Sequence, residues 1–327
     1  MGVTDSSVSP LVTVVTPAYN VARYVGEAVD SVLRQTFANF EYLVVDDGSE
    51  DDSADVARAH AADDLRFRLI QEGHHGLSGA RNIGIREARG RYISYLDGDD
   101  RWHPRFLERQ VALIESLPSE VGAVFARCRM ILENGTPAFL QRERPGSYDF
   151  DDLLIKNNPT RSGSALLIKK SCFADVGGFD ESLQFVEDFE CWLRIAAGSK
   201  TPLFWANRRY LVDQRLRPGQ ITKDRSSSDQ AILQFLAEQT PKLQRFPVGL
   251  AYIRPAVMAL KHGADNEITE KLAASARTAG LGELARTNWG RQLLFWDTLP
   301  PSGRQLVRGI QRSAREAVKS ANRKIRG

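Results

Sequence analysis

Short apolar runs alternate with helix-like segments over the first 120 residues, and this alternation is what most limits the fold. Each run is rich in β-branched and aromatic residues, which is typical of buried strands. In the segments between them, apolar residues recur at helical spacing. Strands and helices that alternate at this spacing form parallel sheets with helices on both faces. The sequence therefore predicts an α/β fold, with strands at residues 11–16, 40–45, 67–70 and 92–96.

Turn residues mark the expected helix starts. Asn20 follows a proline-containing turn and is predicted to cap the helix after it. Ser49, with Asp52 three residues on, has the spacing of a capping box for the second helix. Residues 77–88 are expected to form the third helix, and Pro104 is expected to start the fourth.

The run 92–96 ends in the acidic segment Asp97-Gly98-Asp99-Asp100. Carboxylates this close together repel each other unless a cation or hydroxyl donors lie between them. A hard ion such as Mg²⁺ or Mn²⁺ is held by one or two carboxylates together with phosphate oxygens. One interpretation is thus a site for a metal and a nucleotide-sugar. The other is an acidic turn in which Asp99 or Asp100 caps the next helix, and this segment alone leaves both open.

Three further polar segments each allow a functional and a structural interpretation. Asp46-Asp47 ends the second run and suits either a base or ribose contact, or a helix cap. Arg81 lies among small residues at a helix start, where an anion is favoured, although it could equally face solvent. Glu187-Asp188 opens a helix at 187–197, where acids complement the helix dipole or supply a general base. His74 and His75 lack a third ligand at a recognisable spacing, which argues against a histidine metal site.

The alternation weakens beyond residue 120. Strands are expected at 121–126 and 165–169, on either side of a polar segment at 134–161, and a turn is expected at 177–180. From about residue 226 the pattern becomes helical. We therefore predict a catalytic domain at residues 1–222 and a C-terminal helical region at 223–327, with helices at 230–239, 248–261, 268–279 and 283–296.

Composition limits the cellular setting in which the protein is expected. No stretch approaches the roughly 18 apolar residues of a membrane span, and residues 1–10 lack the features of a signal peptide. Three scattered cysteines indicate a reducing cytosol rather than a disulfide framework or a zinc site. Residues 301–327 hold eight basic residues and one acid, a net charge of +7 against +3 for the whole chain, which leaves −4 for residues 1–300. Apolar residues at helical spacing make 304–326 an amphipathic basic tail that suits an anionic membrane surface, a partner protein or solvent.

Taken together, these segments resemble the inverting nucleotide-sugar glycosyltransferases of family 2, which have the GT-A fold: a Rossmann-like, mostly parallel sheet flanked by helices. The resemblance covers roughly residues 11–222, and its motifs occur in the family's order at suitable spacings. Any one of them is common, but five or six in order are highly specific. They are Val14–Asn20, Val45–Ser49, Ala80–Asn82, Asp97–Asp100, Gly177–Asp180, and Glu187-Asp188 with Trp192–Arg194.

The resemblance implies a nucleotide site. Pro17 and Tyr19 would wall the nucleobase, and Asn20 is grouped with them as a nucleotide-binding residue. Asp47 would bond the base, and Arg81 would lie along the base and the phosphate.

The resemblance also implies a divalent metal, Mn²⁺ or Mg²⁺. Asp99 would bind the metal that bridges the diphosphate, and Asp97 would reach the ribose or the metal. Where the family often has a histidine after its last strand, this sequence has Arg217. An arginine cannot ligate a cation, but it could pair with the diphosphate.

On the acceptor side, Asp188 would be the general base. Gly177, Gly178 and Trp192 would border the acceptor, and Glu187 is placed with them.

The expected reaction moves a sugar, with a UDP-sugar favoured as donor, to a hydroxyl of a glycan or lipid-linked glycan. We expect a cytoplasmic enzyme, with peripheral contact at the cytoplasmic face of the membrane as one option, and no nucleic-acid partner, because no stacking motif is present. The main alternative is an inactive nucleotide- or glycan-binding scaffold of the same fold. A nucleotidyltransferase is disfavoured because no glycine-rich phosphate loop follows the first strand.

Overall fold

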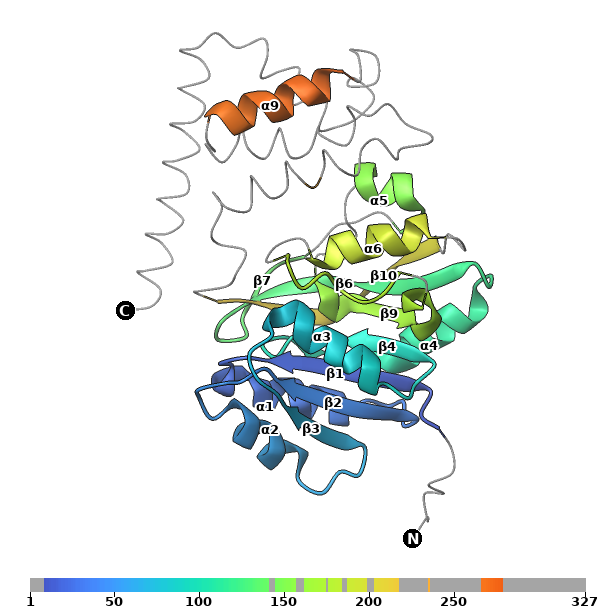
Figure 1. Ribbon diagram of the computed structural model, residues 1–327. Coiled ribbons are helices and arrows are strands. Elements are labelled where there is room, and N and C mark those ends of the chain that lie inside the picture. The colour runs from blue at the N-terminus through green and yellow to red at the C-terminus, as the bar shows by residue number, and fades with distance from the viewer. Residues whose placement is uncertain are drawn as a thin grey trace. The chain divides into compact units, whose positions relative to one another are not determined.

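The computed structural model describes residues 9–140, 145–156, 162–174, 176–183, 187–198, 203–217, 235 and 266–278 (Figure 1). By its internal contacts the chain divides into two compact units, Met1–Gln220 and Ile221–Gly327. The activity assigned above to the first region, and the extension assigned to the second, remain predictions.

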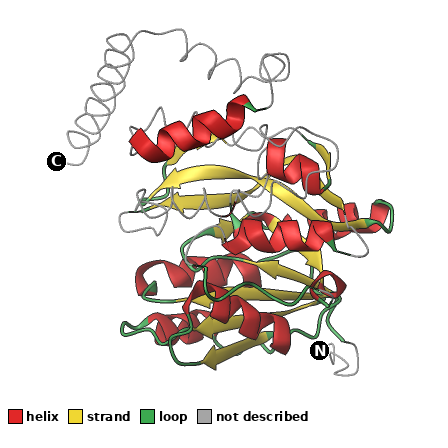
Figure 2. Ribbon diagram, turned by 45° about the horizontal axis from the view of Figure 1, so that its top comes forward, coloured by secondary structure: helices red, strands yellow, loops and turns green. Residues whose placement is uncertain are grey.

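The first unit begins with a parallel sheet. Strand β1 pairs with β2 on one side and with β4 on the other, and β2 pairs with β3. Every residue of β1, β2 and β4 is buried, as expected for strands covered on both faces. Figures 1 and 2 show α3 on one face of this sheet and α1 and α2 on the other. The bounds are β1 Val12–Ala18, α1 Ala22–Leu33, β2 Phe40–Asp46, α2 Ser53–Ala61, β3 Phe67–Gln71, α3 Gly76–Glu87 and β4 Tyr92–Tyr95.

The rest of the sheet is mixed. Strand β9 (Leu166–Lys169) runs antiparallel to both β4 and β6 (Val121–Leu132), and β10 (Leu203–Leu216) runs parallel to β6. Strand β5 (Arg101–Trp102) closes the order β3-β2-β1-β4-β9-β6-β10-β5 among the described residues. The predicted α/β fold with its central parallel strands is confirmed. Strand β10 was not expected, because polar residues near its middle interrupt the apolar pattern.

Shorter elements complete the described part of this unit. Helix α6 (Glu187–Ala197) has the predicted bounds. Helix α4 (Phe106–Ser116) begins two residues after Pro104, and not at it. The described residues of the polar segment at 134–161 include two strands and a helix. These are β7 (Pro137–Leu140), β8 (Gly146–Tyr148) and α5 (Phe150–Lys156), and two 3₁₀ turns follow at Gly163–Ala165 and Lys170–Phe173.

Both predicted helix caps are wrong. Asn20 has a φ of 51° and accepts a hydrogen bond from the Glu50 N–H at 2.9 Å, so it ties two loops together instead of capping α1. The N–H of Val21, at the start of α1, donates to Ser53 Oγ at 2.8 Å. Ser49 Oγ accepts from the Asn20 N–H at 3.1 Å and makes no capping bond in α2. Each side chain accepts a hydrogen bond from an N–H group of the neighbouring loop, because the turns after β1 and β2 meet at one sheet edge.

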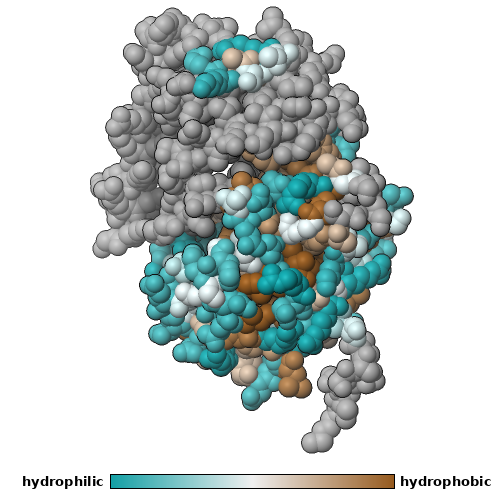
Figure 3. All heavy atoms as spheres, in the orientation of Figure 1, coloured by the Kyte–Doolittle hydropathy of each residue, from teal (hydrophilic) through white to brown (hydrophobic). Residues whose placement is uncertain are grey.

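The core of this unit combines aliphatic and aromatic side chains and lies on both faces of the sheet. Helix α1 buries Val25, Val29 and Val32 at the predicted helical spacing, and α4 buries Leu107 and Ile114. In the view of Figure 3 the described surface is mostly hydrophilic, and a band of hydrophobic residues shows through its middle.

In the second unit the structure describes Phe235 and α9 (Asn266–Arg277), which buries Ala273 and Ala276. The helix predicted at 268–279 corresponds to α9. The helices predicted at 230–239 (apart from Phe235), 248–261 and 283–296, and the basic tail at 304–326, lie outside the described residues. Among the described helices, none has both the length and the hydrophobicity needed to cross a membrane.

Candidate active site

Three strand ends meet at one edge of the sheet. Strands β1, β2 and β4 are parallel neighbours, so Tyr19, Asp47 and Asp97 all follow carboxyl ends of adjacent strands. The Asp47 N–H donates to the Ala18 carbonyl oxygen at 2.9 Å, which ties the first two ends together. Open α/β sheets bind ligands at such an edge.

Asp47 is held by the start of α3. It is 2% exposed, and its carboxylate accepts from the N–H groups of His75 (2.7 Å) and Gly76 (2.9 Å). Nδ1 of His74 lies 3.0 Å from the same carboxylate, and the His74 ring packs on that of Tyr19 at a centroid distance of 4.4 Å. Because Tyr19 is 43% exposed, this aromatic pair offers a surface beside Asp47.

His74 is not among the site residues predicted from the sequence, where the two histidines are weighed only as metal ligands. Their position directly before the start of α3 was the available signal. Pro17, predicted to wall a base, is buried in β1, where it pairs with Val45.

Arg81 bridges two distant acidic segments. Its Nη2 lies 3.1 Å from Asp97 Oδ1, and its Nη1 lies 2.9 Å from Glu187 Oε1. The guanidinium also lies 5.3 Å from the centre of the Phe179 ring. Burial lowers the pKa of Arg81, but the charges of Asp97, Glu187 and Asp188 outweigh it, and the net shift is upward. Arg81 therefore stays charged and joins the loop after β4 to the start of α6.

Asp188 lies in this charged cluster. Its Oδ1 accepts from the Phe189 N–H at 2.6 Å. Burial, then the charge of Glu187, raises the pKa of Asp188 to about 7, while Arg81 acts in the opposite direction. A carboxyl group with a pKa near neutrality is suited to accept a proton.

Within the acidic segment, Asp99 and Asp100 have different surroundings. Asp99 forms an ion pair with Nε of Arg217, and its pKa is raised by burial and by the charge of Asp97. Asp100 is 2% exposed and accepts from Ser164 Oγ at 2.7 Å, from Ser162 Oγ at 3.2 Å and from the Arg215 N–H at 2.9 Å. Neither residue caps a helix. Asp100 ties the segment to β10, and Asp99 remains beside Asp97.

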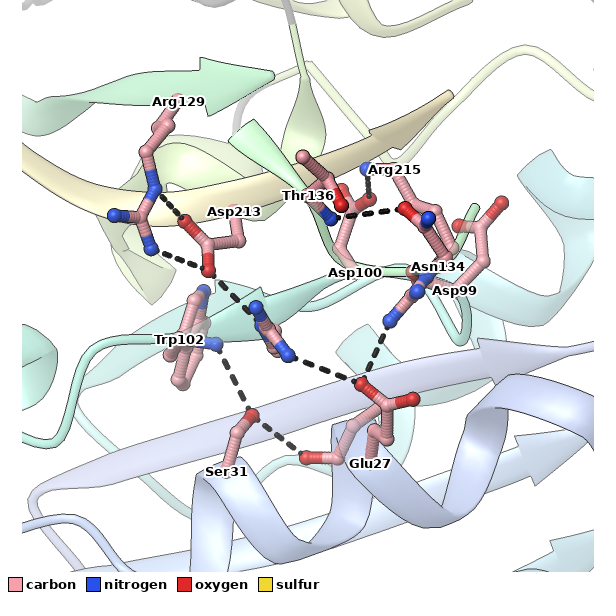
Figure 4. Close-up of polar contacts among 12 residues, drawn as sticks. Glu27, Ser31, Asp99, Asp100, Trp102, Arg129, Asn134, Thr136, Asp213 and Arg215 are labelled. Atoms are coloured by element: carbon pink, nitrogen blue, oxygen red, sulfur yellow. Dashed lines mark hydrogen bonds and ion pairs between the residues drawn. The ribbon is translucent and has the colours of Figure 1, made fainter. Parts of the chain in front are cut away.

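Arg215 connects this loop to α1. It donates from Nε to the Asp99 carbonyl oxygen at 2.9 Å and from Nη2 to Glu27 Oε2 at 2.7 Å (Figure 4). Nearby, Asp213 pairs with Arg129 at 2.7 Å and with Arg101 at 2.9 Å.

Arg215 and Asp213 are not among the residues predicted from the sequence, because strand β10 is not predicted either. The available signal was the two-residue spacing of Asp213, Arg215 and Arg217, which places them on one side of an extended chain.

The residues predicted to border the acceptor make several contacts within the protein. The Phe179 N–H donates to Asn82 Oδ1 at 2.7 Å, and the Gly178 carbonyl oxygen accepts from Arg194 at 2.8 Å, so the turn is fastened to α3 and α6. Gly177 is exposed and has a φ of 74°. Glu187 is paired with Arg81.

Trp192 is 0% exposed and packs against Phe173, Phe179 and Phe204. Its ring lies in the core and offers no surface to an acceptor, because these three aromatic side chains surround it.

The chemistry of Asp97 and Asp99 fits a divalent cation that is shared with a ligand. In the described part of the chain, no group of three or more His, Cys, Asp or Glu residues is arranged to hold a metal alone. Two mutually repelling carboxylates, however, match the pattern in which Mg²⁺ or Mn²⁺ takes one or two protein oxygens and completes its shell with phosphate and water. Their negative charge is met in this structure by Arg81 and Arg217.

The profile of Glycosyl transferase family 2 matches residues 13–177, about half of the chain, so this protein belongs to that family. It is 30% identical over 218 residues to an uncharacterized glycosyltransferase of Rickettsia prowazekii, covering 65% of this chain and 66% of that protein. It is 34% identical over 195 residues to one of Rickettsia bellii, covering 58% of this chain but only 28% of that protein. The chain thus spans less than two thirds of the length of both.

Solved structures show the same fold. Staphylococcus aureus TarS 1–349, in complex with UDP-GlcNAc, matches with a TM-score of 0.62 at 15% identity, covering 94% of this chain and 92% of that one. The mannosyltransferase PcManGT of Pyrobaculum calidifontis, in complex with GDP-Man and Mn²⁺, matches with a TM-score of 0.58 at 20% identity, covering 90% and 89%. The predicted family and the GT-A-type fold are therefore confirmed.

Proposed function

We propose that this protein is an inverting glycosyltransferase that moves a sugar from a nucleoside-diphosphate donor, with a UDP-sugar favoured, to a hydroxyl of a glycan or lipid-linked glycan in polysaccharide or glycoconjugate biosynthesis. The proposal rests on the two ion pairs of Arg81, which join Asp97 to Glu187 beside Asp188. Arg81 brings the predicted donor side and the predicted base together, although they are about 100 residues apart in the sequence.

The surroundings of α3 support a donor site. Tyr19 and His74 form an exposed aromatic pair next to Asp47, which suits the face of a nucleobase. Farther along α3, Ser78 Oγ and Arg81 Nε are buried without a hydrogen-bond partner among the described residues. Buried hydrogen-bonding groups usually have partners. Ser78 Oγ and Arg81 Nε therefore favour an anionic group of the ligand near the start of the helix. The related folds that hold UDP-GlcNAc and GDP-Man are consistent with a nucleotide-sugar here.

The proposed step is a single displacement. The acceptor hydroxyl oxygen forms a bond to the anomeric carbon as the bond from that carbon to the diphosphate oxygen breaks. The hydroxyl proton passes to the carboxylate of Asp188, and the diphosphate leaves with the bonding electron pair. One base on the side opposite the leaving group is sufficient, and the configuration of the sugar inverts.

The chain's own residues would stabilise the leaving group. Arg81 and Arg217 supply guanidinium groups that pair well with phosphate oxygens. A divalent cation held by Asp97 and Asp99 would add Lewis-acid stabilisation of the diphosphate. For Arg217 to reach a phosphate, its ion pair with Asp99 has to open.

The direct test is release of nucleoside diphosphate from a panel of UDP-, GDP- and dTDP-sugars in the presence of Mn²⁺, with and without glycan acceptors. We expect one donor to be consumed and Asp188→Asn to stop transfer. Full folding and nucleotide binding, with no release from any donor, would favour the inactive scaffold instead. The cytoplasmic and peripheral-membrane location remains part of the proposal.

A further inference from the structure

Strand β10 contains an irregularity at residues 207–209. Ala206 pairs with Phe125 and Tyr210 pairs with Arg127, so three residues of β10 face the single residue 126 of β6. Such a bulge changes the direction in which side chains point. Consecutive residues of β10 can therefore line the same surface, which regular strand alternation would prevent.

Hydrogen bonds connect the bulge to α4. The Arg209 N–H donates to Asn207 Oδ1 at 2.8 Å, and Asn207 Nδ2 donates to Gln110 Oε1 at 2.6 Å. Gln110 is 0% exposed and lies on α4. The His103 N–H, just before α4, donates to the Leu211 carbonyl oxygen at 2.9 Å. The bulge and the start of α4 are therefore held together on both sides.

This arrangement forms a surface pocket of about 490 Å³. We call it the arginine pocket. It lies near the middle of β10 and away from Arg215 and Arg217, which reach the acidic segment at the end of that strand. Its lining includes Arg105 and Arg109 from the α4 side and Arg208 and Arg209 from the bulge, together with His103 and Tyr210.

The pocket has more positive charge than nearby acids can balance. Arg105 is paired with Glu108 at 2.5 Å. Arg109, Arg208 and Arg209 form no close ion pair with any residue that the structure describes, and Glu108 is the acid whose charge acts on Arg109. Three such guanidinium groups around one pocket repel each other unless an anion lies between them.

We propose that the arginine pocket binds the phosphate group of a ligand at a site separate from the donor site. Guanidinium groups present planar pairs of N–H donors that match phosphate oxygens, and several of them can share one phosphate group. The phosphate belongs either to a soluble phosphorylated molecule or to a phospholipid headgroup. Both present the phosphate group that the arginine pocket would bind.

The test compares the wild-type protein with two double variants. Arg208→Ala/Arg209→Ala removes two charges from the pocket. Arg34→Ala/Arg58→Ala removes two charges from exposed positions, one directly after α1 and one on α2, and serves as the control. Binding of inorganic pyrophosphate is measured by calorimetry at low salt, and pelleting is measured with vesicles of phosphatidylcholine alone or mixed with phosphatidylglycerol.

We expect the pocket variant to lose about tenfold or more in affinity for one of these probes, and the control to stay within about twofold of the wild type. Loss of pyrophosphate binding alone identifies a soluble ligand, and loss of pelleting on anionic vesicles alone identifies a headgroup. Equal losses in both double variants would show diffuse charge attraction and overturn the proposal, as would a wild-type protein that binds neither probe.

A third variant guards against misfolding. Arg208→Lys/Arg209→Lys keeps the charge but removes the planar donors, so its affinity should lie between those of the wild type and the alanine variant. Thermal unfolding of each variant checks that the fold is retained. A lysine variant that binds as tightly as the wild type would contradict recognition by guanidinium groups.

Discussion

Arg217 and Asp99 form an ion pair between residues 118 positions apart in the sequence. The pair places a guanidinium group on one of the two carboxylates predicted to hold a divalent cation. The same arginine occupies the position where family 2 often has a histidine. The charge of Asp99 is thus balanced in this structure by a residue of the chain itself.

Replacing Arg217 should separate its two proposed roles. In Arg217→Ala, the affinity for UDP should fall about tenfold, because a charge-assisted bond to the diphosphate is lost. Binding of Mn²⁺ without nucleotide should become tighter, because Asp99 no longer has a competing cation. Calorimetry with each ligand measures both effects, and Arg86→Ala, an exposed change on α3, is the control. Weaker Mn²⁺ binding in Arg217→Ala would contradict the competition.

Asp188→Asn should remove the base and leave the donor site intact. We expect the rate of transfer to fall by about 10²- to 10⁴-fold, the usual contribution of a general base. Nucleotide affinity should change little. Initial-rate kinetics and nucleotide titration give the two values, and Asp63→Asn provides an exposed aspartate as the control. Near-normal turnover in Asp188→Asn would exclude this residue as the base.

The pH dependence of transfer should follow the same carboxyl group. Burial and the charge of Glu187 raise the pKa of Asp188 to about 7. A base acts only when it is deprotonated, so kcat/KM should rise about tenfold per pH unit below this pKa and level off above it. Measuring kcat/KM from pH 5 to 9 shows this rise, and the residual activity of Asp188→Asn should not show it. A flat profile in the wild type would be inconsistent with this assignment.

The two neighbouring acids Asp99 and Asp100 should differ in what they support. Asp100→Asn should destabilise the fold by about 1–3 kcal/mol, because its buried carboxylate holds Ser162, Ser164 and the Arg215 N–H. Asp99→Asn should instead weaken Mn²⁺-dependent nucleotide binding with a smaller loss of stability. Thermal unfolding and nucleotide titration of both variants separate these outcomes. Equal stability losses would show that the two acids have the same structural role.

The adjacent glycines 177 and 178 should respond differently to substitution. A Cβ at Gly178 would lie 2.0 Å from Asn82 Oδ1. Gly178→Ala must therefore displace either the turn or the Asn82 side chain, which holds the turn like a clamp through its hydrogen bond with the Phe179 N–H. Gly177 has a φ of 74° and open space around it, a conformation that asparagine tolerates. We therefore expect Gly178→Ala to lower both the unfolding temperature and the activity, and Gly177→Asn to be mild. The reverse order would contradict the clamp.

Local pattern was sufficient for the central part of the fold. Strands β1 to β4, α3 and α6 lie within one or two residues of their predicted bounds, because their apolar residues recur at strand or helical spacing and turn residues mark their ends. Strand β10 was not predictable in this way. Its bulge and its charged residues are stabilised by β6, by α4 and by Glu27, all of them distant in the sequence.

The sequence by itself determined where the acidic segments stand, at strand ends and at a helix start, because chain periodicity fixes which positions are buried and where an element stops. Only the tertiary structure decided the partners: Arg81 between Asp97 and Glu187, Asp47 on the start of α3, Arg217 on Asp99, and Trp192 in the core. The physical reason is range. Periodicity reports on residues a few positions apart, whereas an ion pair depends on how whole strands and helices pack.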